Sequence, residues 1–190
     1  MKGDYYHTKE SVQEYIQLAK NVNGKALIEQ LKKVLAPRSD LLELGSGPGT
    51  DWEILSRSFH VTGSDHSSEF LDHLKTTHPT GEFFELDATT LTTEEQFDGI
   101  YSNKVLHHLS DNQLKDSVKR QHKILNPDGI ICHSFWKGEG DEVFKGMFVN
   151  YHTQEDLHNL FDPYFEIISI HPYMEFEDGD SLLLIGRKKG

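Results

Sequence analysis

Apolar residues near the amino terminus recur at the spacing of an amphipathic helix, once over residues 9–20 and again over 24–35. Pro37 follows the second run and stops the pattern, because proline lacks a backbone donor and clashes with the preceding helical turn. The apolar positions are Val12, Tyr15, Ile16, Ala19, Leu27, Ile28, Leu31, Val34 and Leu35. The sequence therefore predicts two helices ahead of its first strand.

Short apolar runs typical of buried strands then alternate with segments of helical spacing. The expected strands lie near 41–45, 59–64, 82–86, 97–102 and 129–136, and the expected helices lie near 51–57, 67–76 and 111–125. The last helix should end at the breaker sequence Asn126-Pro127-Asp128-Gly129. This alternation favours an α/β fold with a mostly parallel sheet covered on both faces.

The carboxyl-terminal part of the chain has a different order of elements. A helix is expected near 153–161, followed by two strands over 165–170 and 181–186. The acidic turn Glu177-Asp178-Gly179-Asp180 lies between these two strands. Two successive strands without a helix between them predict an antiparallel hairpin at the end of the sheet.

Length and composition fit a single domain over residues 1–190, with 36% hydrophobic and 26% charged residues. The 31 acidic and 19 basic residues give a net charge of −12, which argues against nucleic-acid or anionic membrane surfaces as partners. Cys132 is the single cysteine, which excludes an internal disulfide and a cysteine-rich zinc site. No signal-like or membrane-spanning apolar stretch stands out, so we expect a cytoplasmic protein.

A glycine-rich turn follows the first apolar strand, within the segment from Asp40 to Asp51. Its glycines at alternate positions are Gly45, Gly47 and Gly49. Glycine allows positive φ and a close approach of the backbone to a ligand, and the helix start that follows offers free N–H donors. Two acids, Asp65 and Asp87, then close the next two strands. The pattern predicts a cradle for a nucleotide-like cofactor.

Other glycine-turn families fit this segment less well. The dinucleotide-binding pattern Gly-x-Gly-x-x-Gly places its third glycine where this chain has Thr50, and Gly49 lies one residue earlier. A phosphate-binding loop needs Gly-Lys-Ser/Thr, which is absent. A purely structural turn is the remaining alternative.

Several motifs come in an order that resembles the class I S-adenosylmethionine-dependent methyltransferases, of the small-molecule type, along most of the chain. They are Glu43-Leu44-Gly45-Ser46-Gly47-Pro48-Gly49, the acid Asp65, the pair Leu86-Asp87, the strand Phe97-Asp98-Gly99-Ile100-Tyr101-Ser102-Asn103, and Val105-Leu106-His107-His108-Leu109. The resemblance implies a three-layer Rossmann-like fold with a seven-stranded sheet whose last strand is inserted antiparallel. It also implies S-adenosylmethionine as the cofactor.

The resemblance assigns cofactor-binding roles to particular residues. Asp65 would bind the ribose hydroxyls, which suits a carboxylate because it only accepts hydrogen bonds. Asp87 with the backbone of Ala88 would meet the adenine, while Glu43 and Asn103 would face the methionine end. The full predicted set is Glu43, Gly45, Ser46, Gly47, Gly49, Asp65, His66, Asp87, Ala88 and Asn103. A helix cap or a solvated strand end is the alternative for each aspartate.

Methyl transfer needs little from the protein beyond alignment, because the sulfonium already activates the methyl group. If a base takes part, His107 and His108 are the candidates, since they follow the fourth strand at the carboxyl edge and histidine titrates near neutral pH. A packing or substrate-shaping role is the alternative.

Aromatic residues at expected loop ends are candidates for the acceptor pocket: Tyr5, Tyr6, Trp136 and Tyr151. The amino-terminal helical segment, residues 1–36, would cover the cofactor site, and its aromatic residues would order over the bound cofactor. Ordinary core packing of these aromatic side chains is the alternative.

The histidine content suggests no metal site, since the 12 histidines include no His-Glu-x-x-His and are interpreted as scattered surface residues. The predicted function is methyl transfer to a small-molecule oxygen, nitrogen or carbon nucleophile. A protein or RNA methyltransferase is an alternative, although Ser102-Asn103-Lys104-Val105 stands where amide-methylating enzymes carry an Asn-Pro-Pro-Tyr-like motif. A cofactor-binding regulatory or partner subunit without its own activity is the alternative from another class.

Overall fold

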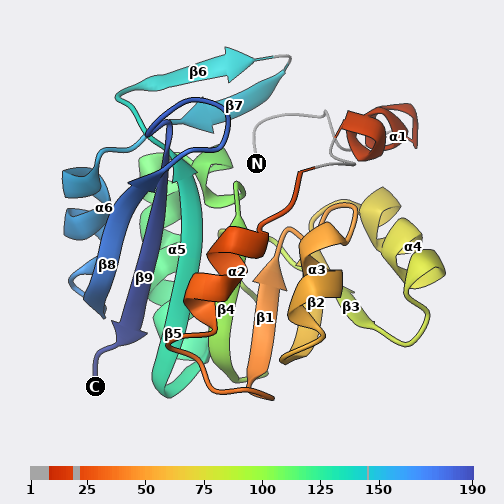
Figure 1. Cartoon of the computed structure of the whole chain (residues 1–190), viewed down its shortest axis with the longest axis horizontal. Coiled ribbons are helices and arrows are strands. Elements are labelled where there is room, and N and C mark those ends of the chain that lie inside the picture. The colour runs from red at the N-terminus through yellow and green to blue at the C-terminus, as the bar shows by residue number, and fades with distance from the viewer. Residues whose placement is uncertain (1–8, 19–21, 145) are drawn as a thin grey trace.

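A computed structural model describes residues 9–18, 22–144 and 146–190 of the chain (Figure 1). The helices are α1 (Lys9–Leu18), α2 (Lys25–Leu31), α3 (Thr50–Leu55), α4 (Ser68–Thr77), α5 (Asp111–Ile124) and α6 (Gln154–Phe161), with one 3-10 turn, η3 (Leu106–His108). The strands are β1 (Asp40–Leu44), β2 (His60–Asp65), β3 (Glu82–Glu85), β4 (Phe97–Asn103), β5 (Leu125–Trp136), β6 (Asp141–Phe144), β7 (Met147–Asn150), β8 (Phe165–Tyr173) and β9 (Ser181–Lys188).

Seven strands form one sheet in the order β3-β2-β1-β4-β5-β9-β8. β1 pairs in parallel with both β2 and β4, and β4 pairs in parallel with β5. β9 is antiparallel to β5 on one side and to β8 on the other, so the predicted carboxyl-terminal hairpin and the predicted fold class are confirmed. The strand order reverses around β1, which places the ends of β1, β2 and β4 at the edge where such sheets bind ligands.

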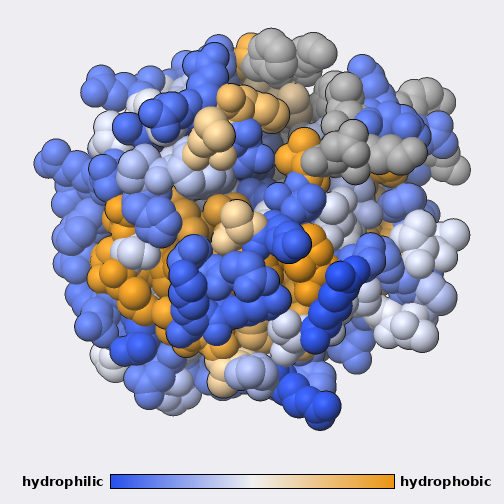
Figure 2. All heavy atoms as spheres, viewed as in Figure 1, coloured by the Kyte–Doolittle hydropathy of each residue, from blue (hydrophilic) through white to orange (hydrophobic). Residues whose placement is uncertain are grey.

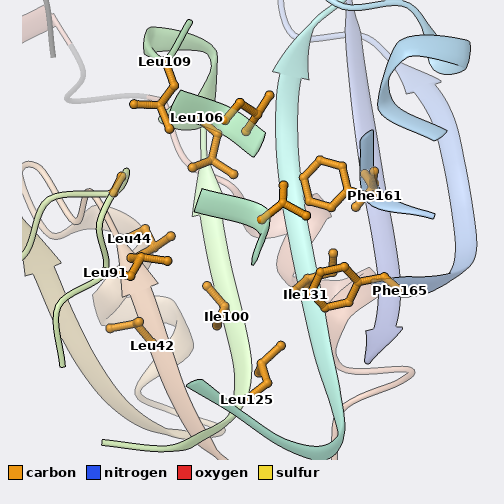
Figure 3. Close-up of a cluster of buried hydrophobic side chains, with 14 of the residues drawn as sticks. Leu42, Leu44, Leu91, Ile100, Leu106, Leu109, Leu125, Ile131, Phe161 and Phe165 are labelled. Atoms are coloured by element: carbon orange, nitrogen blue, oxygen red, sulfur yellow. The ribbon is translucent and has the colours of Figure 1, made fainter. Parts of the chain in front are cut away.

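Helices cover both faces of the sheet. In the view of Figure 1, α2 and α3 lie in front of the strands, α5 lies behind them, and α6 lies beside β8. The front core contains Ile28 and Leu31 of α2 against Leu41 of β1. The opposite core packs Leu42, Leu44 and Ile100 with side chains of α5, α6 and the turns, as Figure 3 shows. Two apolar layers on one sheet make this a three-layer α/β domain.

The structure corrects the expected boundary after α5. β5 begins at Leu125, which pairs with Phe97, whereas the expected strand began near residue 129. The breaker sequence therefore lies inside the span of β5, where Asp128 has φ 62° and the register shifts between Phe97 and Gly99. The break ends the helix as expected, but the chain rejoins the sheet on both sides of it.

A small hairpin, β6 and β7, lies outside the seven-stranded sheet and was not expected from the sequence. In Figure 1 it lies above the carboxyl end of β5. Its apolar residues form two short runs, Val143-Phe144 and Met147-Phe148-Val149, so they lack the alternating apolar pattern that predicts a strand.

The surface in the view of Figure 2 is mostly hydrophilic, with hydrophobic residues in separate patches. Large apolar side chains that are more than two-thirds exposed include Phe176 at 70% and Met174 at 67%, in the segment between β8 and β9. Among the helices that the structure describes, none has the length and apolar character needed to span a bilayer.

Candidate active site

The glycine loop follows β1, and all three of its glycines have positive φ: 66° at Gly45, 49° at Gly47 and 86° at Gly49. A Cβ added at Gly47 would meet no atom within 4 Å, so its backbone borders open space. A Cβ at Gly49 would lie 2.7 Å from a methyl group of Leu74 in α4. Gly47 therefore lies on the open side of the loop, while Gly49 permits close packing of α3 against α4.

Asp65 ends β2 and is tied directly to the glycine loop. Its Oδ2 accepts the backbone N–H of Gly47 at 2.9 Å, and its Oδ1 accepts the N–H of Ser67 at 2.9 Å. Burial raises the pKa of Asp65 above its ordinary value, and these backbone donors oppose that rise. The backbone N–H of His66 also donates to this carboxylate, so one of its four lone-pair sites remains for a hydroxyl donor.

Glu43 lies in β1 beneath the glycine loop and is only 2% exposed. Its Oε2 accepts the hydroxyl of Ser46 at 2.5 Å. Burial, followed by the nearby charge of Asp51, raises the pKa of Glu43 to about 8. At neutral pH this side chain therefore holds a proton, and a cationic group placed beside it would favour the ionised form.

Asp51 accepts hydrogen bonds from two distant parts of the chain, the residue before α2 and the end of β4, and the sequence did not identify it as a site residue. Its carboxylate accepts the N–H of Gly24 at 2.6 Å, the hydroxyl of Tyr101 at 2.8 Å and the amide Nδ2 of Asn103 at 3.0 Å. Burial and the charge of Asp51 raise the pKa of Tyr101 well above its ordinary value, so this phenol remains a donor. Asn103 is thereby oriented, because its Oδ1 also accepts the hydroxyl of Ser134 at 2.6 Å.

Two cavities adjoin at the glycine loop, and together they are called the cleft. The larger measures about 280 Å³ and the smaller about 80 Å³. Both are lined by Tyr15, Gly45, Gly47, Asn103 and Lys104. The larger cavity also reaches Glu43, Ser46, Asp51 and Trp136, and the smaller one reaches Asp65, His66, Ala88 and His108. The cleft thus brings together most of the residues predicted to bind the cofactor.

Asp87 follows β3 and is half-buried beside the cleft, although it does not line either cavity. Its Oδ1 accepts the N–H of Thr89 at 2.6 Å. Burial acts to raise the pKa of Asp87, but the hydrogen bonds from Thr89 outweigh it and leave that pKa below its ordinary value. The carboxylate is therefore ionised and shapes the turn that places Ala88 in the smaller cavity.

The rings of His107 and His108 contact each other in η3, with centroids 4.0 Å apart and planes tilted by 50°. His108 lines the smaller cavity, and its Nδ1 lies 2.7 Å from the carbonyl oxygen of Phe148, so Nδ1 carries a hydrogen. His107 is 3% exposed, lines neither cavity, and its buried Nδ1 has no hydrogen-bond partner among the residues that the structure describes. Burial lowers the pKa of both rings, so both are neutral near pH 7.

Of the predicted acceptor residues, only Trp136 lines the cleft among those that the structure describes. Tyr151 borders a separate cavity with His152, and its hydroxyl donates to Glu142 at 2.5 Å. Tyr5 and Tyr6 lie outside the described residues. Tyr15 of α1 instead reaches both cavities of the cleft.

Lys104 is a further cleft residue that sequence reasoning missed. It follows Asn103 with φ 56°, and its Nζ lies 3.3 Å from the centroid of the Trp136 ring. The ammonium donates to the carbonyl of Phe135 at 3.1 Å and to the hydroxyl of Ser181 at 2.6 Å. Burial lowers the pKa of Lys104 to about 7. No sequence signal separates this lysine from an ordinary surface lysine.

The interpretation of the histidines as surface residues is wrong for three of them. His107, His133 and His152 are buried, with 3%, 0% and 2% exposure. His133 bridges Ser102 and Gln121 at 2.8 Å on each side, which gives it a structural role in the core. Within the described residues, no group of three or more potential ligands is placed to hold a metal ion.

Residues 41–129 match the family model described as "Methyltransferase domain". The match covers just under half of the chain. This stretch contains the glycine loop, Asp65, Asp87 and the two histidines of η3, which are the motifs that carried the resemblance. The predicted family is therefore confirmed.

Solved structures of similar fold agree with that family. A 1,6-didemethyltoxoflavin-N1-methyltransferase from Burkholderia thailandensis, solved with S-adenosylhomocysteine, matches with a TM-score of 0.78 and 20% identity over 95% of this chain and 85% of that one. An amino pentose methyltransferase from Micromonospora echinaspora, solved with S-adenosylmethionine, matches with a TM-score of 0.76 and 14% identity over 94% and 97%. At such identities the likeness establishes the methyltransferase fold.

A trans-aconitate 2-methyltransferase from Enterobacter sp. (strain 638) is 34% identical over 77 residues, which are 39% of this chain. The match covers 31% of that relative, so the chain corresponds to about a third of its length. The match does not extend to the rest of the relative.

Proposed function

We propose that this chain is an S-adenosylmethionine-dependent methyltransferase that acts on a small-molecule acceptor. The main support for this proposal is that the glycine loop, Asp65 and Glu43 all line one cleft. The backbone of Gly47 borders open space, as a loop that cradles a cofactor requires. The family match over residues 41–129 and the ligands named in the similar structures support the same cofactor.

The residues of the cleft fit the parts of this cofactor. Asp65 would accept a hydrogen bond from the ribose hydroxyls, and Ala88 and His66 would border the adenine. Glu43 and Asn103 would face the methionine end, where the larger cavity lies. When bound, the cofactor supplies a methyl group that its sulfonium already activates.

The chain itself would orient the acceptor and keep water away. Trp136 and Tyr15 form apolar walls of the larger cavity. His108 is neutral and fixed by Phe148, and His107 lines neither cavity, which favours shaping over proton transfer for this pair.

A small-molecule acceptor suits the size of the cleft. The larger cavity holds about 280 Å³, part of which the cofactor would fill. The named acceptors of the relatives, trans-aconitate and a didemethylated toxoflavin, are small molecules, and the net charge of −12 disfavours RNA.

Calorimetry with S-adenosylmethionine, S-adenosylhomocysteine, NAD and ATP tests the cofactor assignment. We expect the first two to bind at one site per chain and the last two to show no binding. Tighter binding of NAD than of S-adenosylhomocysteine would refute the assignment. Release of S-adenosylhomocysteine is then screened over a metabolite library. Cofactor binding without release for any acceptor would favour a regulatory or partner subunit.

A further inference from the structure

The part of the larger cavity beyond the predicted cofactor residues is walled by aromatic side chains and one acid. Tyr15 comes from α1, Trp136 from the end of β5, and Glu175 and Phe176 from the segment between β8 and β9. The rings of Trp136 and Phe176 are stacked, with centroids 5.9 Å apart and an interplanar angle of 21°. Glu175 and Phe176 also line an adjoining cavity of about 330 Å³, which extends this acceptor side outward.

The basic character of this cavity rests on a single lysine. Among the residues that line it in the described structure, Lys104 is the only lysine or arginine. Two of its three donors are engaged with the Phe135 carbonyl and the Ser181 hydroxyl, and its charge lies over Trp136. Burial also lowers the pKa of Lys104 to about 7, although the nearby charges of Glu175 and Asp180 oppose that fall, so a share of this lysine is uncharged at neutral pH. Lys104 is therefore a weak site for an anion.

Acidic groups outweigh this lysine. Asp51 and Glu175 line the same cavity, with Glu175 on the acceptor side, while Glu43 beside them holds a proton at neutral pH and adds no negative charge. The backbone beside Glu175 is fixed, because Asp180 accepts the N–H of Glu175 at 2.9 Å and that of Phe176 at 2.9 Å. A carboxylate next to stacked aromatic rings is a combination that binds organic ammonium groups, through charge and through the ring faces.

We propose that the methyl acceptor carries a positively charged amino group on an apolar or aromatic body, with the amino group bound by Glu175 and the body against Trp136 and Phe176. The inference rests on the proposed function, because it identifies the acceptor side by the position of the predicted cofactor residues. A polycarboxylate such as the one named for the Enterobacter relative would bring like charges together in this cavity.

The test uses the full chain saturated with S-adenosylhomocysteine, so that Glu43 and Asp51 are covered. Phenethylamine is titrated by calorimetry, with 2-phenylethanol and phenylacetate as its neutral and anionic counterparts. We expect phenethylamine to bind at least tenfold more tightly than phenylacetate. Glu175→Gln should reduce that preference by about tenfold, as expected for a lost charge-assisted hydrogen bond, and should leave affinity for S-adenosylhomocysteine unchanged.

Glu177→Gln is the matched control, because Glu177 lies in the same segment but its side chain is exposed and lines no part of the cleft. It should keep the wild-type preference. Three results would overturn the amine assignment. Phenylacetate could bind as tightly as phenethylamine, the preference for phenethylamine could be unchanged in Glu175→Gln, or none of the probes could bind. Failure of S-adenosylhomocysteine to bind would instead refute the proposed function. The three probes would then be compared on the free protein, and the effect of Glu175→Gln on the preference for phenethylamine would still test the amine assignment.

Discussion

Glu43 offers a prediction whose magnitude follows from its burial. The side chain is 2% exposed, and burial together with Asp51 raises its pKa from an ordinary 4.5 to about 8. The folded protein therefore keeps this proton up to about pH 8, while the unfolded chain releases it near pH 4.5. The stability that this group contributes is fully present below pH 4.5 and is lost as the pH rises toward 8.

The size of the effect follows from 1.36 kcal/mol per pKa unit, so the whole rise corresponds to about 5 kcal/mol. Between pH 6 and pH 8 the loss should be on the order of 2–3 kcal/mol. Glu43→Gln removes the ionisation and keeps the shape. The free energy of unfolding of this variant, relative to wild type, should therefore increase by that amount across the same interval.

Urea unfolding of both proteins at pH 6, 7 and 8 measures this difference. The comparison between variant and wild type is needed because buried histidines such as His107 and His133 have lowered pKa values and change stability in the opposite direction. Glu85→Gln, an exposed strand carboxylate, is the control and should show a constant difference. A constant difference for Glu43→Gln as well would show that Glu43 ionises normally and would refute the reasoning.

Three further predictions concern the cleft. Asp65→Ala should weaken S-adenosylhomocysteine binding by about 1–3 kcal/mol in calorimetry, and Asp87→Ala should weaken it less. If the Asp65 variant unfolds but its folded fraction keeps the wild-type affinity, Asp65 is a structural cap instead. His108→Ala should mainly raise the apparent KM, whereas a loss of about 10²–10⁴-fold in kcat with a missing limb of the pH profile would identify a general base. Hydrogen exchange over residues 4–16 should slow when S-adenosylhomocysteine binds, and deletion of residues 1–10 should reduce turnover more than stability. Unchanged exchange together with full activity of the truncated protein would contradict the prediction that the amino-terminal segment covers the cofactor site.

The glycine loop could be predicted because its requirements are local. Positive φ at Gly45, Gly47 and Gly49 needs glycine at those positions, so the residue type already reports the backbone. The aspartate that ends β2 could be predicted for a similar reason, since a carboxylate directly after an apolar strand lies at the ligand-binding edge.

The contacts of Asp51 could not be predicted, because they join groups far apart in the chain. Asp51 is 50 residues from Tyr101 and 27 from Gly24 in sequence, and only the packing of α3 beside the carboxyl end of β4 brings them together. His133 was misjudged for the same reason. Its partners Ser102 and Gln121 lie on β4 and α5, and no spacing within the sequence relates these residues to it.

Lys104 connects the predicted cofactor side of the cleft with the proposed acceptor side. Its backbone N–H donates to Ser134, whose hydroxyl donates to Asn103, and its ammonium donates to Ser181. Ser181 in turn donates to Asp180, the carboxylate that holds the backbone of the segment carrying Glu175 and Phe176. A displacement of Asn103 by a bound ligand would therefore act on Ser134, Lys104 and the acceptor wall through continuous hydrogen bonds. Lys104 takes part in these hydrogen bonds with a φ of 56°, a conformation that is uncommon for residues other than glycine.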